Sequence, residues 1–411
     1  MTRPYSADAS EVFVIIGAGQ TGATAAAEMR QQGFSGRIIL IGEEPHLPYE
    51  RPPLSKDVLL QPANTRCQIY PDTFYSDNAI ELRLGHRVTD LNLTLRQVVL
   101  ANGEVTPFDK LLLATGSRVR RYPLLDRLER DVYTLRTLDD AEALKPVLQP
   151  GKRILIVGGG VIGLELASSA VDLGAQVQVI EQAPRLMGRG APLVVADYLQ
   201  ESHRQRGVHF HLGAGLISAE RGDGEIVLTL DNGMCLSGDA VIYGIGVELN
   251  TELASAAGLA VDKGVLINEH CRTSHPSIYA AGDVASQWNP ALEQYVRLET
   301  WENAKNQAIA AAQSMVSGVA RSFEVPWFWS DQCGMNIQLA GSSVAQEWLV
   351  RGQLSDSRFT LIGMTDGRVV GAVTVNNGRD MRSVKTLIAS QASPDRALLL
   401  DSTKDLRRLV C

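Results

Sequence analysis

A glycine-rich turn between an apolar strand and a helical segment constrains the fold of this chain more than any other feature. Residues 154–157 form the strand, and the turn has the spacing G-x-G-x-x-G, with glycines Gly158, Gly160 and Gly163. The first glycine permits a tight turn, the second lets backbone N–H groups approach a pyrophosphate, and the third allows close helix–strand packing. A second strand ends at Glu181, where an acid accepts hydrogen bonds from a ribose 2′-hydroxyl and repels a 2′-phosphate. The segment therefore predicts a dinucleotide site that prefers NADH to NADPH.

The same pattern occurs near the start of the chain. An apolar stretch of five residues leads into Gly17, Gly19 and Gly22, and a helical stretch and an apolar strand follow. The acid at the end of that strand is Glu43, with Glu44 as the alternative. Two such units predict an α/β protein with two Rossmann-like domains. They also predict two bound nucleotides, or one dinucleotide and one flavin dinucleotide.

Two further segments suit a cofactor site. Residues 45–60 contain four prolines, which stiffen a loop that carries Arg51 and Lys56. Residues 110–113 read as a buried strand that ends in Ala114-Thr115-Gly116, where the backbone can pass close to a cofactor. A hairpin is expected just before that strand, turning at Asn102-Gly103.

Composition narrows the function classes. A length of 411 residues indicates two to three domains, and a formal net charge of −7 argues against nucleic acid as a partner. The sequence has no run long and apolar enough for a membrane helix and no signal-peptide core. Five scattered cysteines without a C-x-x-C pair fit a reducing cytoplasm, and the seven histidines show no metal-ligand spacing. No nucleophile motif such as G-x-S-x-G occurs.

Several segments together resemble a known family. They are the two glycine turns, LPYERPPLSK, ATGS, YTLRTLDDA, VIGLELA, YGIGVELN, IYAAGDVAS, ETWENAKNQA and PWFWSDQ. They resemble FAD-dependent pyridine-nucleotide oxidoreductases of the glutathione-reductase fold. Within that group the chain is most similar to ferredoxin reductases of bacterial aromatic ring-hydroxylating dioxygenases of the 3-phenylpropionate and biphenyl types. Putidaredoxin reductase and rubredoxin reductase are nearby relatives.

This resemblance implies three domains and a ferredoxin–NAD⁺ reductase activity. The FAD-binding domain would comprise residues 1–112 and 245–323, the NADH-binding domain residues 113–244, and a smaller α+β C-terminal domain residues 324–411. NADH would pass hydride to the flavin, which releases electrons singly to a [2Fe–2S] ferredoxin of Rieske type. That ferredoxin would feed a terminal oxygenase. The protein would be cytoplasmic and would use neither nucleic acid nor a membrane.

The resemblance also implies the residues of each site. Those expected at FAD are Gly17, Ala18, Gly19, Gln20, Thr21, Gly22, Glu43, Arg51, Lys56, Val88, Ala114, Thr115, Gly116, Arg136, Gly282, Asp283, Glu299, Thr300, Trp301 and Trp329. Those expected at NAD are Gly158, Gly159, Gly160, Val161, Ile162, Gly163, Glu165, Glu181 and Gly246. Asp283 would bind the ribitol while N–H groups of a helix directly after it meet phosphate. No metal site is expected.

Lys56 and Glu165 are the expected catalytic pair. By resemblance, Lys56 lies near flavin N5, where its charge stabilises the reduced ring, and Glu165 is its counter-ion. Glu165 lies among apolar residues, so it needs a partner if it is buried. Trp301 and Trp329 would flank the flavin ring.

Three alternatives are considered. The sequence argues against a disulfide reductase, which would need a redox cysteine in the 48–60 loop, where there is none. A second alternative changes the acceptor to a P450-type ferredoxin, rubredoxin or oxygen. A third is a flavin-bound signalling protein similar to apoptosis-inducing factor. For a ferredoxin, the expected docking residues are basic: Arg118, Arg120, Arg121, Lys305 and Arg321.

Overall fold

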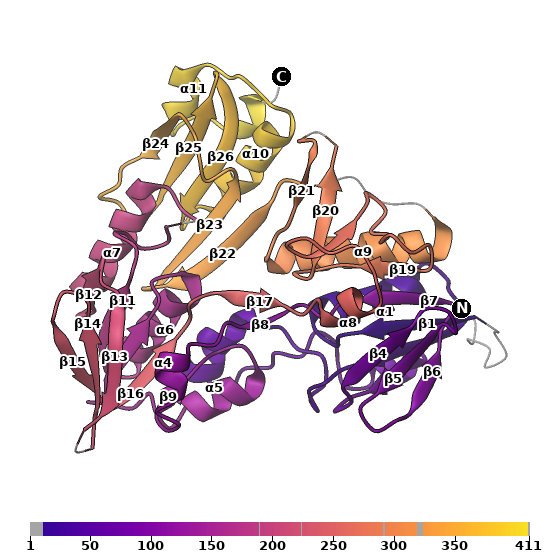
Figure 1. Ribbon diagram of the computed structural model, residues 1–411. Helices are drawn as coiled ribbons and strands as arrows, with labels where there is room; N and C mark the ends of the chain where they lie inside the picture. The colour runs from indigo at the N-terminus through magenta and orange to yellow at the C-terminus, as the bar shows by residue number, and fades with distance from the viewer. Residues whose placement is uncertain (1–10, 189, 223, 291, 319–323, 410–411) are drawn as a thin grey trace. The chain divides into compact units, whose positions relative to one another are not determined.

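The structure is a computed structural model that describes residues 11–188, 190–222, 224–290, 292–318 and 324–409 (Figure 1). It contains two compact units, each assembled from separate stretches of the chain. Unit 1 comprises residues 1–50, 66–118 and 247–323, and unit 2 comprises residues 51–65, 119–246 and 324–411. Strands β8 (Ser117–Val119) and β17 (Val247–Leu249) lie where the chain passes from one unit to the other.

Unit 1 is built on a parallel sheet with the strand order β19-β7-β1-β2-β3. Its strands are β1 (Val12–Ile16), β2 (Arg37–Ile41), β3 (Ile80–Arg83), β7 (Lys110–Leu113) and β19 (Ile278–Ala280). Most of their side chains are buried, as expected for a parallel sheet covered on both faces, although three of the four residues of the edge strand β3 are only half-buried. Helices α1 (Gln20–Gln31) and α9 (Trp301–Ser317) pack against each other beside this sheet.

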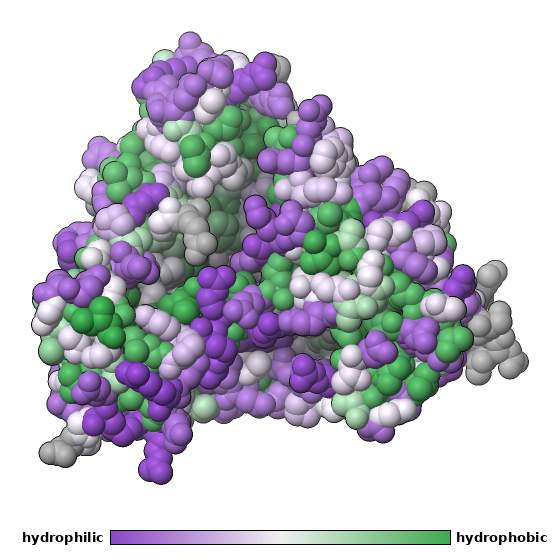
Figure 2. Space-filling model, in the orientation of Figure 1, coloured by the Kyte–Doolittle hydropathy of each residue, from purple (hydrophilic) through white to green (hydrophobic). Residues whose placement is uncertain are grey.

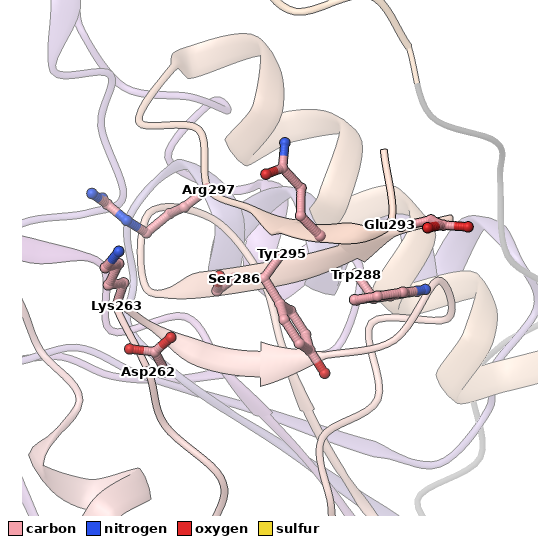
Figure 3. A pocket seen from close by; sticks show the side chains of 8 residues that line it. Asp262, Lys263, Ser286, Trp288, Glu293, Tyr295 and Arg297 are labelled. Atoms are coloured by element: carbon pink, nitrogen blue, oxygen red, sulfur yellow. The ribbon is translucent and has the colours of Figure 1, made fainter. Parts of the chain in front are cut away.

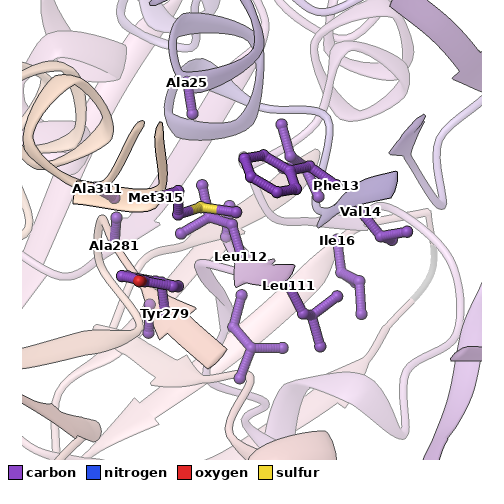
Figure 4. Packing of buried hydrophobic residues seen from close by; sticks show 14 of the residues in the cluster. Phe13, Val14, Ile16, Ala25, Leu111, Leu112, Tyr279, Ala281, Ala311 and Met315 are labelled. Atoms are coloured by element: carbon purple, nitrogen blue, oxygen red, sulfur yellow. The ribbon is translucent and has the colours of Figure 1, made fainter. Parts of the chain in front are cut away.

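The core of unit 1 joins segments that are distant in sequence (Figure 4). Phe13 and Leu112 from neighbouring strands, Tyr279 from β19 and Met315 from α9 are each at most 2% exposed. The other elements are α3 (Phe74–Asp77), β4 (Val88–Asn92), β5 (Gln97–Leu100), β6 (Val105–Pro107), α8 (Glu252–Ala256), β18 (Val265–Ile267), β20 (Ala285–Asn289) and β21 (Gln294–Val296). Strands β4-β5-β6 form an antiparallel sheet, and β18-β20-β21 form another.

Unit 2 repeats the plan of unit 1. Its parallel sheet has the order β12-β11-β10-β16-β9, with β10 at the centre as β1 is in unit 1. The strands are β9 (Val132–Tyr133), β10 (Arg153–Val157), β11 (Gln176–Glu181), β12 (His209–Leu212) and β16 (Ala240–Tyr243). An antiparallel sheet, β13 (Leu216–Arg221), β14 (Ile226–Leu230) and β15 (Cys235–Gly238), is inserted before β16, as β4-β5-β6 is before β7. The helices are η1 (Pro52–Ser55), α2 (Asp57–Leu60), α4 (Pro123–Asp126), α5 (Leu138–Leu144), α6 (Val161–Asp172) and α7 (Leu193–Gln205).

The rest of unit 2 is an antiparallel sheet of order β22-β23-β26-β25-β24 with helices beside it. Its elements are β22 (Trp327–Gln332), β23 (Met335–Gly341), β24 (Glu347–Gly352), β25 (Phe359–Thr365), β26 (Arg368–Val375), α10 (Gly378–Ala389), α11 (Arg396–Leu400) and η2 (Leu406–Leu409). Arg351 is 4% exposed and holds the last helical segments against the sheet. It pairs with Asp380 at 3.1 Å and donates to the backbone carbonyl oxygens of Leu399, Asp401 and Lys404.

The expected α/β class, with two Rossmann-like sheets and an α+β C-terminal part, is confirmed. One local expectation is wrong. No helix follows Asp283 directly, because the chain turns at Asp283 and enters β20 and β21, and the next helix, α9, begins at Trp301. The proline-rich segment is also more regular than a loop, since it contains the single turns η1 and α2.

On the face shown in Figure 2, hydrophobic residues lie in small groups between hydrophilic ones. Among the described helices, we find none with the length and apolar character that crossing a membrane requires.

Candidate active site

The first glycine turn lies between β1 and α1 in unit 1. Gly17 has φ +112°, and a Cβ there would lie 2.1 Å from the carbonyl oxygen of Ala114. A Cβ at Gly22 would lie 1.9 Å from the carbonyl oxygen of Gly17, so both positions require glycine. A Cβ at Gly19, by contrast, would meet nothing within 4 Å. Gly19 is also the N-cap of α1 and provides no side-chain cap, so the helix N-terminus faces space that an anion can fill.

The second turn, between β10 and α6 in unit 2, has the same geometry. Gly158 has φ +117°, and a Cβ there would lie 2.4 Å from the carbonyl oxygen of Gly244. A Cβ at Gly163 would lie 2.0 Å from the carbonyl oxygen of Gly158. Gly160 caps α6 without a side-chain hydrogen bond, and its Cβ would face open space. Each turn therefore fits a pyrophosphate at a helix N-terminus.

The acid of each unit lies at or just beyond the end of the second strand. Glu181 ends β11, and its two carboxylate oxygens accept hydrogen bonds from the N–H groups of Gly159 and Ala183, both at 2.7 Å. The carboxylate is thus fixed beside the glycine turn. In unit 1, Glu43 follows β2 with its side chain 71% exposed, whereas Glu44 accepts from the hydroxyl of Tyr49 at 2.5 Å. This geometry favours Glu43 over Glu44 as the ribose ligand.

The segment after β7 lies against the first glycine turn. Ala114 closes over Gly17, and Thr115 exchanges two hydrogen bonds with Asn250, one from each residue's side chain, at 2.7 and 2.8 Å. Gly116 has φ +62°. These contacts hold the Ala114–Gly116 backbone at the carboxyl end of the sheet, where cofactors of such folds bind.

The Ala-Gly-Asp segment also reaches this edge of unit 1. A Cβ at Gly282 would lie 2.4 Å from Oγ1 of Thr21 in α1, so the two predicted segments are in contact. Asp283 accepts from the Ser117 hydroxyl at 2.9 Å. Gln20, at the start of α1, has a buried Oε1 with no hydrogen-bond partner among the residues that the structure describes. These groups fit a polar ligand along the first turn.

The other residues predicted for the flavin in unit 1 lie on β4 and at the start of α9. Val88 is buried at the beginning of β4. Thr300 caps α9 by accepting from the N–H of Asn303 at 3.1 Å, and Glu299 pairs with Arg297. Trp301 is the first residue of α9, with the Lys305 ammonium 5.3 Å from its ring centre.

Arg51 and Arg136 are brought together in unit 2. The Arg51 guanidinium donates to the backbone carbonyl oxygen of Arg136. The N–H of Arg136 donates to Asp140, which also closes the capping box of α5 with Thr137. A capped helix thus positions the segment that Arg51 contacts.

Lys56 and Glu165 form a buried ion pair, as predicted. Lys56 Nζ lies 3.2 Å from Glu165 Oε1, and the side chains are 12% and 3% exposed. On its more exposed side, Lys56 lies 3.4 Å from Asp331 Oδ2. Burial raises the pKa of the Glu165 carboxyl above its ordinary value, while Lys56 and the hydroxyls of Ser55 and Ser330 act against that shift.

Two stacked tryptophans on β22 adjoin this pair. The rings of Trp327 and Trp329 are 5.3 Å apart with an interplanar angle of 22°. Lys56 Nζ lies 5.6 Å from the centre of the Trp329 ring, and Trp329 donates from Nε1 to Asp331 at 3.0 Å. Trp329 therefore forms one wall around the Lys56 ammonium.

Sequence reasoning missed the polar residues that surround Glu165. Ser55 Oγ donates to Glu165 Oε2 at 2.5 Å, and Ser330 Oγ donates to Oε1 at 2.7 Å. Gln332 Nε2 donates to Ser330 Oγ at 2.8 Å, and Gln332 Oε1 lies 2.8 Å from His203 Nε2. We call His203, Gln332, Ser330 and Glu165 the polar chain. One signal was available, since His203 lies four residues after the buried Leu199 on the apolar face of α7.

The other residues predicted for NAD lie around the second turn. Val161 and Ile162 open α6, and the Ile162 side chain is 44% exposed. Gly246, after β16, has φ +108° and open space at its Cβ position. An exposed apolar side chain beside open backbone suits contact with a nucleotide.

Two of the expected docking residues are engaged in ion pairs. Arg118 pairs with Glu248 at 3.2 Å and Glu252 at 2.6 Å, and Arg121 pairs with Asp126 at 2.8 Å. Arg321 lies outside the described residues.

A separate pocket lies in unit 1 on the hairpin β20–β21 (Figure 3). Trp288 and Tyr295 pack edge to face in it, with ring centres 5.3 Å apart. None of its lining residues was predicted for a cofactor: Asp262, Lys263, Ser286, Trp288, Glu293, Gln294, Tyr295 and Arg297. Within the described part of the chain, no group of three or more His, Cys, Asp or Glu residues could hold a metal ion.

Comparison with known proteins found two family models that match the chain. A family model described as pyridine nucleotide-disulphide oxidoreductase matches residues 12–308, and one described as reductase C-terminal matches residues 327–410. The ferredoxin–NAD(+) reductase component of a 3-phenylpropionate/cinnamic acid dioxygenase from Photorhabdus laumondii subsp. laumondii is 48% identical over 383 residues. These residues cover 93% of this chain and 97% of the relative.

Two solved structures are similar over nearly the whole chain. The reductase in the covalent putidaredoxin reductase–putidaredoxin complex superposes with a TM-score of 0.93 at 33% identity, covering 98% of this chain and 99% of that one. The ferredoxin reductase for the CYP199A2 system of Rhodopseudomonas palustris superposes with a TM-score of 0.92 at 32% identity, covering 98% of this chain and all of that one.

Proposed function

The chain belongs to the pyridine nucleotide-disulphide oxidoreductase family, and we infer that it is an NADH-dependent ferredoxin reductase that uses FAD and serves a dioxygenase. One structural observation carries this inference: each unit presents a glycine turn with open space at an uncapped helix N-terminus, and an acid close to the end of the neighbouring strand. Bound FAD supplies the redox chemistry, since it accepts a hydride from NADH and gives up electrons one at a time.

The residues of this chain bind and align the two cofactors. We propose that FAD is bound by Gly17–Gly22, Glu43, Arg51, Lys56, Val88, Ala114–Gly116, Arg136, Gly282, Asp283, Glu299–Trp301 and Trp329. NADH is bound by Gly158–Gly163, Glu165, Glu181 and Gly246. Alignment of the reacting atoms is what such a hydride step requires, because no acid or base takes part in it. The domain limits 1–112 with 245–323, 113–244 and 324–411 are part of this proposal, supported by the two similar parallel sheets.

Lys56 provides positive charge at the reaction centre in this proposal. Its ammonium, held by Glu165 at 3.2 Å, would stabilise the negative charge that the flavin gains on reduction. The pair is supported by burial, since a lone charge at Glu165, 3% exposed, would be strongly destabilising. Trp329 and Trp301 would shield the flavin ring from water.

We propose a [2Fe–2S] ferredoxin of Rieske type as the electron acceptor, with the oxygenase as the next component. The support is the 48% identity to a dioxygenase component, compared with 33% and 32% to the two structural relatives. A reductase for a P450-type ferredoxin or rubredoxin is the second candidate, favoured by the CYP199A2-system relative. Cytoplasmic location is proposed because the four described cysteines are free thiols and NADH is an intracellular reductant.

Anaerobic titration of the purified protein tests this function. We expect a yellow protein that one equivalent of NADH bleaches, that NADPH bleaches far less efficiently, and that oxidised [2Fe–2S] ferredoxin returns to yellow. A Rieske-type and a P450-type ferredoxin, compared in parallel, identify the acceptor. Colourless protein that cannot be reconstituted with FAD would refute the proposal. Flavin reduction without transfer to either ferredoxin or to rubredoxin would instead indicate a signalling flavoprotein.

A further inference from the structure

The polar chain runs from the buried face of α7 to the Lys56–Glu165 ion pair and joins elements that are far apart in sequence. His203 lies on α7, Gln332 and Ser330 on β22, and Glu165 on α6, and none of the four is more than 3% exposed. All its links are within 2.8 Å, and all its members belong to unit 2. Such a series of buried hydrogen bonds has one consistent arrangement of protons, because each buried polar group left without a hydrogen-bond partner would destabilise the fold.

The arrangement of protons follows from the carboxylate. Glu165 can only accept, so the single hydroxyl hydrogen of Ser330 points to it. Ser330 must then accept from the amide NH₂ of Gln332, which turns Gln332 Oε1 toward His203. His203 therefore carries its proton on Nε2. Its Nδ1 has no hydrogen-bond partner among the described residues, which suits a neutral ring with a bare lone pair there.

The polar chain also fixes on which side of Lys56 the carboxylate of Glu165 lies. Alternate residues of a strand point to opposite faces, so Ser330 and Gln332 face Glu165 while Trp329 and Asp331 share the other face. Lys56 contacts residues of both faces, with Glu165 on the buried side and Asp331 on the exposed side. A carboxylate free to rotate would let the Lys56 ammonium move toward Asp331.

We propose that Gln332 and His203 are positioning residues for the reaction: through Ser330 they fix the carboxylate of Glu165, and through it the ammonium group of Lys56. The role of Lys56 beside the flavin rests on the function proposed above, whereas the direction of the polar chain does not. The charged or titratable groups around Glu165 and the chain are Lys56 on the η1–α2 segment, Asp331 on β22, and His203 and Arg206 on and after α7.

The first experiment tests the direction of the hydrogen bonds in the polar chain and needs no cofactor chemistry. Nuclear magnetic resonance of protein labelled with ¹⁵N-histidine reports which ring nitrogen carries the proton, and the signal of His203 is identified as the one lost in His203→Gln. We expect a neutral ring protonated on Nε2 at neutral pH. A ring protonated on Nδ1, or a doubly protonated ring, would overturn the proposal whether or not the protein reduces ferredoxin.

The second experiment measures the effect on the reaction. The rate of flavin reduction by NADH is followed in single turnovers across a pH series for Ser330→Ala, Gln332→Met and His203→Phe. Loss of a donor destabilises the carboxylate anion, so the acidic limb of the profile should move upward by about one pH unit in Ser330→Ala. Gln332→Met and His203→Phe should move it in the same direction by less, with NADH affinity unchanged.

Two controls separate positioning from stability. His203→Gln restores a donor close to the place of Nε2 and should return the wild-type profile. Thr360→Val removes hydrogen bonds of a fully buried threonine on β25, outside the polar chain, and should lower stability without moving the profile. The proposal fails if Thr360→Val and Gln332→Met shift the profile equally, or if His203→Gln behaves as His203→Phe. If wild-type flavin is not reduced by NADH, the function proposed above fails, and the tautomer of His203 still decides the inference.

Discussion

Replacing Glu181 by alanine should reverse much of the preference for NADH. In the structure both carboxylate oxygens accept from backbone N–H groups at 2.7 Å, so the carboxylate is held in place beside the glycine turn before any nucleotide binds. A hydrogen bond to a charged group contributes about 1.5–3 kcal/mol, so losing one from a ribose hydroxyl should raise KM for NADH roughly 10- to 150-fold. Removing the negative charge also ends repulsion of a 2′-phosphate, so kcat/KM for NADPH should rise roughly tenfold.

The assay is steady-state reduction of ferricyanide with each nucleotide, which does not depend on the ferredoxin. Glu220→Ala, an exposed acid on β13 of the same unit, is the matched control and should leave both values unchanged. Since only nucleotide binding is altered, kcat with NADH should stay near the wild-type value. A ratio of NADH to NADPH efficiency that stays within about threefold of wild type would refute the assigned role of Glu181.

Four further changes test other features. Gly160→Ala should fold normally, because its Cβ meets nothing within 4 Å, yet raise KM for NADH roughly tenfold or more by filling the space before the helix. Gly163→Ala should fail to reach wild-type thermal stability, because its Cβ would lie 2.0 Å from a carbonyl oxygen. Burial lowers the pKa of His203 below its ordinary 6.5, so below that pH only the unfolded state gains the proton and stability falls with acidification. His203→Gln should remove this part of the pH dependence in urea unfolding from pH 7.5 to 5. Arg351→Met should lower the free energy of unfolding by about 3–5 kcal/mol, whereas exposed Arg358→Met should change it by less than about 0.5 kcal/mol.

The parts of the fold that follow from local sequence were predictable. Gly22 and Gly163 were required for reasons confined to one turn and one helix, and the structure shows each of them close to a carbonyl oxygen of its own turn. The approaches of Gly17 to Ala114 and of Gly158 to Gly244 instead join residues far apart in sequence. The Lys56–Glu165 contact came from family resemblance, because nothing local joins residues so far apart in sequence. The helix expected after Asp283 was wrong, since the hairpin β20–β21 is stabilised by pairing with β18 rather than by local propensity.

The polar chain is the part of the candidate site that could not be predicted from the sequence. Its members come from α6, α7 and β22, and each alone is an ordinary polar residue. Ser55 and Ser330 have no pattern around them that distinguishes a carboxylate donor from a surface serine. Only His203, on the apolar face of an amphipathic helix, carried a signal, and it indicated burial without indicating a partner.

The discontinuous make-up of unit 2 determines when its ion pair can form during synthesis. Lys56 leaves the ribosome before Glu165, and Ser330 follows Glu165 by 165 residues. Until then the acid lacks the Ser330 hydroxyl, one of the two hydroxyls that donate to it, so a nascent chain buries it at greater cost. The ion pair therefore has its full set of hydrogen bonds only after β22 has been synthesised and has folded beside α6.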